Sequence, residues 1–138
     1  MTSTTDTTLY DQLGGAATVV RLVDAFYDNM DQLGPAQGIR AMHGSDLGPV
    51  RLILKTYLTE WLGGPSNYSA TRGHPRLRMR HARFPIGPAE RDAWMMCMNK
   101  ALVDVVEDAA LRELLQANFR NLADWMRNDP GNAHDARG

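Results

Sequence analysis

The sequence contains a single cysteine, Cys97, and this scarcity excludes several kinds of site. One thiol cannot form an intrachain disulfide, a cysteine-based zinc cluster or the paired attachment of a covalent haem. A chain without disulfides is typical of a reducing compartment, so we predict a cytoplasmic protein. Methionines flank Cys97 on both sides, and an inert buried thiol is its expected role.

A charge imbalance and a long apolar run are also missing. The 15 Lys and Arg residues nearly balance the 16 Asp and Glu residues, and a net charge of -1 gives no global attraction to nucleic acid or anionic lipid. No stretch approaches the roughly 18 consecutive apolar residues of a membrane span, and the N-terminus lacks the pattern of a secretion signal. We therefore expect neither nucleic acid nor a membrane among the partners.

Common catalytic motifs are absent from the chain. We find no P-loop, no His-Glu-x-x-His and no Rossmann glycine fingerprint. The length of 138 residues and the hydrophobic share of 43% fit one globular domain. We predict that this domain spans residues 9–128, between disordered tails at 1–8 and 129–138.

Strand patterns are equally scarce, which makes the chain all-α. Val and Ile supply only ten residues, and apolar residues recur at three and four rather than at two. The pattern predicts helices over 16–30, 49–62, 88–108 and 111–126, a short helix near 77–83 in an otherwise irregular stretch, and a loop with one helical turn between 31 and 48. Gly14-Gly15 marks the start of the first helix, Ser45 or Asp46 the cap of the second, and Gly63-Gly64-Pro65 its end. Such helices could form a plain bundle or cross around a cofactor.

A basic stretch over 72–83 contains five arginines and two histidines without one acid. It could be a solvated surface or pair with acids of a neighbouring helix. It could instead bind an anion, because guanidinium groups suit phosphate and carboxylate. Nucleic acid is a weaker reading, since no aromatic residues are interleaved for stacking bases.

Four side chains with polar tips are candidates for a site, although each also has an ordinary structural role. His81 could be a surface or satisfied core residue, Tyr27 and Trp94 could be bulky core, and His43 lies in the predicted loop before Ser45. A neutral imidazole can alternatively bind iron, and a buried phenol or indole requires a hydrogen-bond partner.

Five stretches of the chain carry a family resemblance. They are Phe26-Tyr27, His43-Gly44-Ser45-Asp46-Leu47, Trp61-Leu62-Gly63-Gly64-Pro65, Gly73-His74-Pro75-Arg76-Leu77-Arg78-Met79-Arg80-His81 followed by Phe84-Pro85-Ile86, and Glu90-Arg91-Asp92-Ala93-Trp94. Over roughly Leu9 to Met126, the chain resembles the group II truncated haemoglobins, the two-over-two globins of bacteria and plants.

The resemblance implies a two-over-two helical sandwich around a non-covalent b-type haem, held between the second and third predicted long helices. His81 would be the proximal iron ligand, and Tyr27, Trp94 and His43 would face the ligand and donate hydrogen bonds. Val50 stands where classical globins place a distal histidine, and Leu54 where some relatives have glutamine. The implied haem contacts, including a propionate partner in Arg80 or Arg83, are Val50, Ile53, Leu54, Tyr57, Leu58, Leu77, Arg80, Arg83, Phe84, Ile86 and Met98.

For function, the resemblance implies reversible binding of dioxygen, carbon monoxide or nitric oxide, as in oxygen transport, by a monomer or homodimer. An alternative is a redox enzyme, such as a nitric oxide dioxygenase or a peroxidase-like enzyme, supplied with electrons by an external reductase. A third alternative is a cofactor-free helical module whose basic stretch binds a phosphorylated partner.

Overall fold

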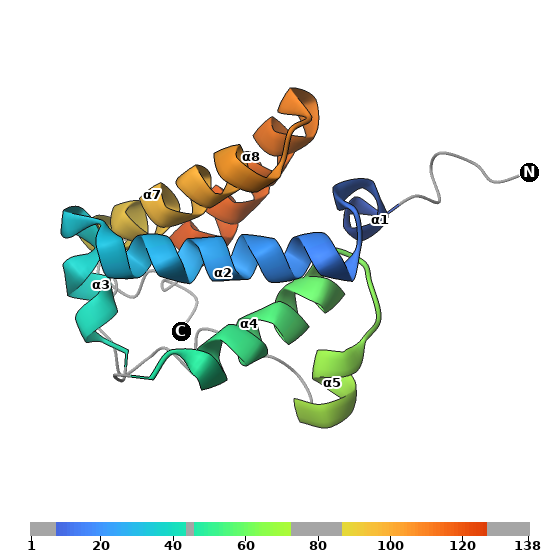
Figure 1. The fold of residues 1–138 in the computed structure, drawn as a ribbon, viewed down its shortest axis with the longest axis horizontal. Helices are drawn as coiled ribbons and strands as arrows, with labels where there is room; N and C mark the ends of the chain where they lie inside the picture. The colour runs from blue at the N-terminus through green and yellow to red at the C-terminus, as the bar shows by residue number, and fades with distance from the viewer. Residues whose placement is uncertain (1–7, 44–45, 73–86, 127–138) are drawn as a thin grey trace, which may run out of the picture.

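The computed structural model describes residues 8–43, 46–72 and 87–126, and all its regular elements in these ranges are helical. This confirms the all-α prediction. The four long helices match the predicted ones closely, whereas the predicted helix near 77–83 lies outside the described residues. The elements, shown in Figure 1, are α1 (Leu9–Leu13), α2 (Ala16–Gln32), the 3-10 turn η2 (Gly34–Ala36), α3 (Gln37–Ala41), α4 (Gly48–Trp61), α5 (Asn67–Arg72), α7 (Pro88–Val105) and α8 (Ala109–Trp125).

Helix α2 is the central element of the fold. It packs against α4 on one side and α7 on the other, and α7 packs in turn against α8 (Figure 1). Two helix pairs, α2 with α4 and α7 with α8, therefore lie one over the other, which is the two-over-two arrangement that the resemblance implies. A buried hydrogen bond crosses the central contact: the amide of Asn29 in α2 donates to the backbone carbonyl of Cys97 in α7 at 3.0 Å.

The two ends of α2 have identifiable causes. Gly15, with a φ of +73°, precedes its first residue, and this confirms that the glycine pair sets the start of the helix. At the other end, the side-chain amide of Gln37 lies within hydrogen-bonding distance of the backbone carbonyls of Met30, Asp31 and Leu33. These contacts satisfy carbonyls that have no partner within the helix.

Helix α4 starts one residue later than the predicted cap. The N-cap is Leu47, while the carboxylate of Asp46 accepts a hydrogen bond from the Gly48 N–H at 2.9 Å as a local turn. The helix ends where predicted, since Gly63 adopts a φ of +99°. A side chain at Gly64 would meet the ring of Tyr10 at 2.8 Å, so a residue without a Cβ is required there.

Helix α5 corrects the prediction that only 77–83 is helical within residues 66–87. Ser69 donates from its backbone N–H and from its hydroxyl to the carboxylate of Glu60 in α4. These two hydrogen bonds lower the pKa of Glu60. Tyr68 is buried, with its ring 5.7 Å from the ring of Tyr57 in α4. Polar and aromatic contacts thus hold a helix too short to show periodicity.

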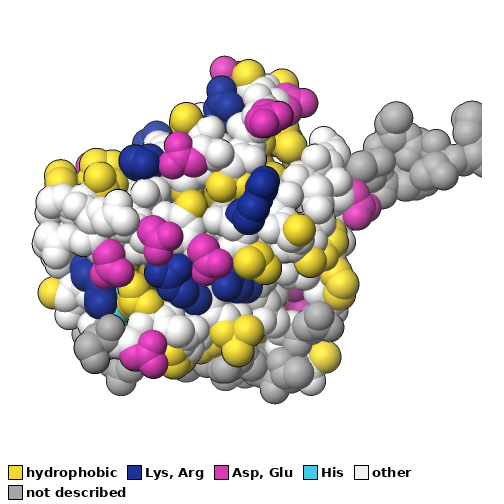
Figure 2. Space-filling view, viewed as in Figure 1, with side chains coloured by type: hydrophobic (Ala, Val, Ile, Leu, Met, Phe, Trp, Pro, Cys, Tyr) yellow, Lys and Arg dark blue, Asp and Glu magenta, His cyan; other side chains and the backbone are white. Residues whose placement is uncertain are grey.

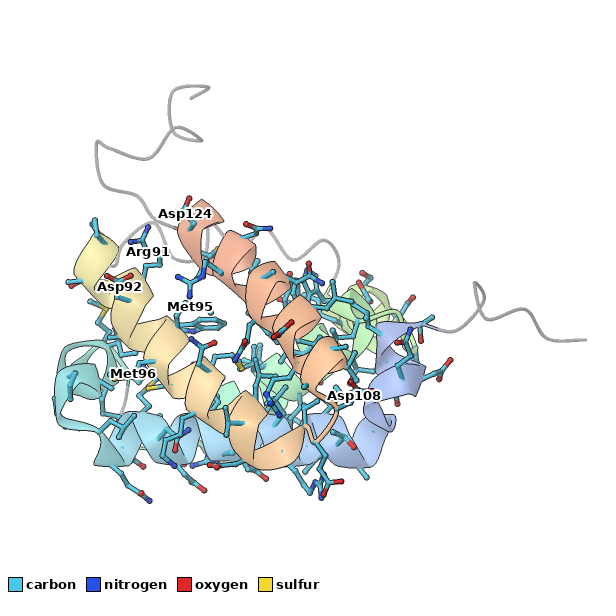
Figure 3. All side chains as sticks on the ribbon, turned by 90° about the horizontal axis from the view of Figure 1, so that it is seen from above. Arg91, Asp92, Met95, Met96, Asp108 and Asp124 are labelled. Atoms are coloured by element: carbon cyan, nitrogen blue, oxygen red, sulfur yellow. The ribbon has the colours of Figure 1, made fainter. Side chains whose placement is uncertain are left out.

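The corner between α7 and α8 is tighter than predicted, because α7 ends at Val105 rather than near residue 108. Asp108 is the N-cap of α8 and accepts a hydrogen bond from the N–H of Leu111 at 3.1 Å. At the opposite end of this pair, Arg91 of α7 forms a 2.7 Å ion pair with Asp124 of α8 (Figure 3).

Side chains of the four long helices form one hydrophobic core. Its completely buried members include Phe26, Leu58, Met98, Leu102 and Phe119. Within the described ranges, no helix has both the length and the apolar character required to cross a membrane.

The N-cap of α8 gives a first test of this description. We expect Asp108→Ala to lower the free energy of unfolding by about 1 kcal/mol, because the Leu111 N–H loses its acceptor. Urea denaturation followed by circular dichroism measures the change. Asp104→Ala is the control: it removes only an exposed pair with Lys100, worth about 0.3–0.5 kcal/mol. Equal losses in the two variants would contradict the capping role.

Candidate functional site

Tyr27 lies in α2 on the side that faces both α4 and the end of α3. Its side chain is buried, and its ring packs edge-on against Phe26 at a centroid distance of 4.9 Å. Burial raises the pKa of the Tyr27 phenol to about 12, and the positive charge of Arg51 opposes this rise only in part. The phenol is therefore a neutral hydrogen-bond donor at physiological pH.

Trp94 of α7 belongs to the same aromatic cluster. Its ring lies 5.0 Å from Phe26 and 6.0 Å from Phe119, and Phe119 lies 5.0 Å from Trp61 of α4. Phe26 thus contacts both Tyr27 and Trp94. No hydrogen bond joins the Tyr27 hydroxyl or the Trp94 indole N–H to any residue in the described ranges.

His43 follows α3, and its ring centroid lies 6.0 Å from that of Tyr27. Of the three residues named from the sequence, Tyr27 and His43 are therefore neighbours, and Trp94 is linked to Tyr27 through Phe26. The Nδ1 atom of His43 is 2.8 Å from the carbonyl oxygen of Ile39. A carbonyl can only accept, so Nδ1 carries the proton in the neutral ring and Nε2 has a lone pair instead of a hydrogen. In this tautomer, His43 has no second N–H to offer a ligand, and its predicted place on the ligand side stays a prediction.

One face of α4 presents the apolar residues that the resemblance assigns to a haem. Leu58 is completely buried, and the other four are half-buried. Tyr57 has a pKa raised to about 12, chiefly by burial and further by the nearby Tyr68 and Glu60. Met98 of α7, another predicted contact, is fully buried in the core. The five residues of this face are Val50, Ile53, Leu54, Tyr57 and Leu58.

The predicted proximal side falls outside the described residues. It comprises His81, Leu77, Arg80, Arg83, Phe84 and Ile86, whose roles stay predictions. Within the described ranges, no group of three His, Cys, Asp or Glu side chains could hold a metal ion directly. The residues present do fit a haem, because an incompletely covered apolar face of α4 lies near phenol and indole donors that lack acceptors in these ranges.

The sequence analysis missed a set of charged residues beside Tyr27. Asp24 and Asp28 of α2 pair with Arg51 and Lys55 of α4 across the contact between the helices. In Figure 2, acidic and basic side chains lie together on this face. The available signal was the spacing of four residues in each pair, which places both charges on one side of a helix.

The buried tyrosines predict a specific loss of stability at alkaline pH. The folded state favours the neutral phenols, so the free energy of unfolding should fall as pH rises from 10, the ordinary tyrosine pKa, to about 12. We expect Tyr27→Phe to make this fall shallower in urea titrations at several pH values. The control Trp61→Phe removes no ionisable group and should keep the wild-type slope. An unchanged slope in Tyr27→Phe would contradict the shift.

Comparison with known proteins identifies the family. The bacterial-like globin family matches residues 8–128. A group 2 truncated hemoglobin of Bacillus subtilis is 35% identical over 114 residues, which cover 83% of this chain and 84% of that protein. The solved group II 2-on-2 hemoglobin of Agrobacterium tumefaciens is 45% identical, with a TM-score of 0.87 over 93% of this chain and 98% of the other. A truncated hemoglobin of Pseudoalteromonas haloplanktis is 41% identical, also with a TM-score of 0.87, over 89% and 99%. The chain therefore belongs to the group II truncated haemoglobins of the bacterial-like globin family.

Proposed function

We propose that this haem globin reversibly binds dioxygen and other diatomic ligands, and that Tyr27 and Trp94 hydrogen-bond the bound ligand. The observation that carries the proposal is that two hydrogen-bond donors, the Tyr27 hydroxyl and the Trp94 indole N–H, have no acceptor in the described ranges. The rings that carry the phenol O–H and the indole N–H both contact Phe26, and neither group donates to a residue in the described ranges. Neither polar atom is completely buried, because Asn99 Oδ1 is the one fully buried polar side-chain atom without a partner in the described ranges. Both donors are therefore open to an external acceptor, which supports a role in binding a ligand.

The family implies haem as the cofactor, and its iron supplies the bond to a diatomic ligand. We assign His81 as the protein ligand of that iron, on the strength of its place in the family motif. The apolar face of α4, from Val50 to Leu58, would cover the porphyrin and exclude water. Arg80 or Arg83 would pair with a propionate.

Within this assignment, Tyr27 and Trp94 slow the release of a ligand that carries partial negative charge. The high pKa of Tyr27 keeps its proton in place over the physiological range. Neutral His43 has a different role, because its proton is directed at the Ile39 carbonyl. Its Nε2 atom offers a lone pair, which repels a negative ligand and can instead accept a hydrogen bond from a neighbouring hydroxyl or water.

Val50 and Leu54 affect the access of ligands. Both side chains are half-buried and apolar, so neither supplies a polar gate on α4. A diatomic molecule would therefore enter past α4 without breaking a hydrogen bond at these two positions.

The first experiment is a titration of the cofactor-free protein with haemin, followed by reduction and exposure to dioxygen and to carbon monoxide. We expect a Soret band that saturates at one haem per chain and clean spectra of both ligand complexes. His81→Gly should lose the normal proximal histidine–iron stretching band in resonance Raman spectra. A wild-type protein without stoichiometric haem, or a normal band in the variant, would overturn the proposal.

The assignment of donors predicts different effects for three substitutions. Tyr27→Phe and Trp94→Phe should each speed dioxygen dissociation about fivefold, the equivalent of one hydrogen bond of about 1 kcal/mol. His43→Phe should not speed dissociation, because neutral His43 donates to Ile39. Stopped-flow displacement by carbon monoxide measures the rates. A larger increase in His43→Phe than in Tyr27→Phe would contradict the assignment.

A further inference from the structure

The contact between α2 and α4 carries a ladder of four charges. Asp24 and Asp28 stand one turn apart on α2, and Arg51 and Lys55 stand one turn apart on α4. Arg51 pairs with Asp24 at 3.1 Å and with Asp28 at 2.8 Å, while Lys55 pairs with Asp24 at 3.1 Å. The ladder thus joins the helix of the ligand-facing tyrosine to the helix of the haem-facing apolar residues.

Arg51 is the most constrained member of this ladder. Its Nη1 donates to both the backbone carbonyl and the carboxylate of Asp24, at 3.2 and 3.1 Å, and its Nη2 donates to Asp28 at 2.8 Å. Its side chain is only 21% exposed. A planar guanidinium held by three acceptors has a fixed position and a fixed orientation.

The fixed guanidinium lies against the ring of Tyr27, with its central carbon 5.6 Å from the ring centroid. A cation at this distance is attracted to the electron-rich face of an aromatic ring. The ring of Phe26 packs on Tyr27 edge-on, and His43 lies 6.0 Å away. Arg51, Phe26 and His43 therefore enclose the Tyr27 ring and restrict its rotation. The positive charge of Arg51 also withdraws electron density from the Tyr27 hydroxyl.

We propose that Arg51 is a positioning residue for Tyr27: clamped by Asp24 and Asp28, it holds the ring in place and strengthens the hydroxyl as a hydrogen-bond donor to the ligand. This inference rests on the proposed role of Tyr27 in ligand binding. Beyond that role, the inference makes the retention of a ligand depend on Arg51, which lies in the contact between α2 and α4.

The chain offers a matched control in Lys55. Lys55 lies one turn along α4 from Arg51, has a similarly covered side chain and pairs with the same carboxylate. The ring contact with Tyr27 is formed by Arg51. Loss of Lys55 therefore removes one positive charge and one ion pair of the ladder without removing the cation from the ring.

The test compares Arg51→Met with Lys55→Met in the haem-loaded protein. In the diamagnetic carbon monoxide complex, we expect wild-type Tyr27 to give separate NMR signals for the two sides of its ring. Arg51→Met should merge these signals by faster rotation and should speed dioxygen dissociation about twofold to fivefold. Lys55→Met should change neither. Arg51→Lys should restore the rate only in part, because a compact ammonium cannot pair with both carboxylates and remain over the ring as the wider guanidinium does.

Asp28→Asn provides a second route if Arg51→Met fails to fold. It removes the 2.8 Å ionic acceptor and leaves Arg51 in place, so it should produce a smaller change of the same sign in both measurements. Wild-type ring signals and rates in Arg51→Met, or in Asp28→Asn where Arg51→Met does not fold, would overturn the inference. Equal effects of Lys55→Met and Arg51→Met would also overturn it. If Tyr27→Phe itself leaves dissociation unchanged, the proposed donor role of Tyr27 fails instead.

Discussion

The packing of Phe26 against both Tyr27 and Trp94 is the contact on which the rest of the site depends. The ring of Phe26 is fully buried and lies about equally far from each of these neighbours. Because it belongs to the core between α2 and α7, any shift of one helix on the other would change the separation of the two donors. The core and the proposed ligand-binding side therefore share the same side chains. A rearrangement of the core would change the positions of the groups that are proposed to contact a bound ligand.

The ion pairs of Arg51 beside Tyr27 show how an interaction near the surface can affect a buried side chain. Exposed ion pairs contribute little to stability when they are considered singly. Arg51 differs because its guanidinium is held by backbone and side-chain acceptors together and its central carbon lies over an aromatic ring. In the proposed role, Arg51 acts on the orientation and polarity of a phenol in addition to joining α2 and α4.

Much of the fold could be predicted from the sequence, for reasons that individual elements make clear. Helices α2 and α4 have apolar faces long enough to show periodicity, and glycines mark the start of α2 and the end of α4. Helices α1 and α5 have only five and six residues, and tertiary contacts hold α5: Glu60 binds Ser69, and Tyr57 packs on Tyr68. Periodicity in the sequence carries no information about such contacts.

The site was less predictable, because its members come from different helices. Periodicity placed Tyr27 and Trp94 on buried faces, but only the family resemblance suggested that they act together. The bond from His43 to the Ile39 carbonyl depends on the exact path of the chain after α3, within a stretch predicted as a loop with one helical turn. The contact of Arg51 with Tyr27 requires knowledge of which helices are neighbours, and a single helix does not contain that information.

The hydrogen bond from Asn29 to the carbonyl of residue 97 has a consequence for how freely this protein can vary. The acceptor is a main-chain atom, so this bond between α2 and α7 does not depend on the thiol beside it. The cysteine can therefore be exchanged for another small side chain without loss of helix register. The asparagine cannot be exchanged in this way, because a side chain without an amide donor would lose the buried hydrogen bond between these helices.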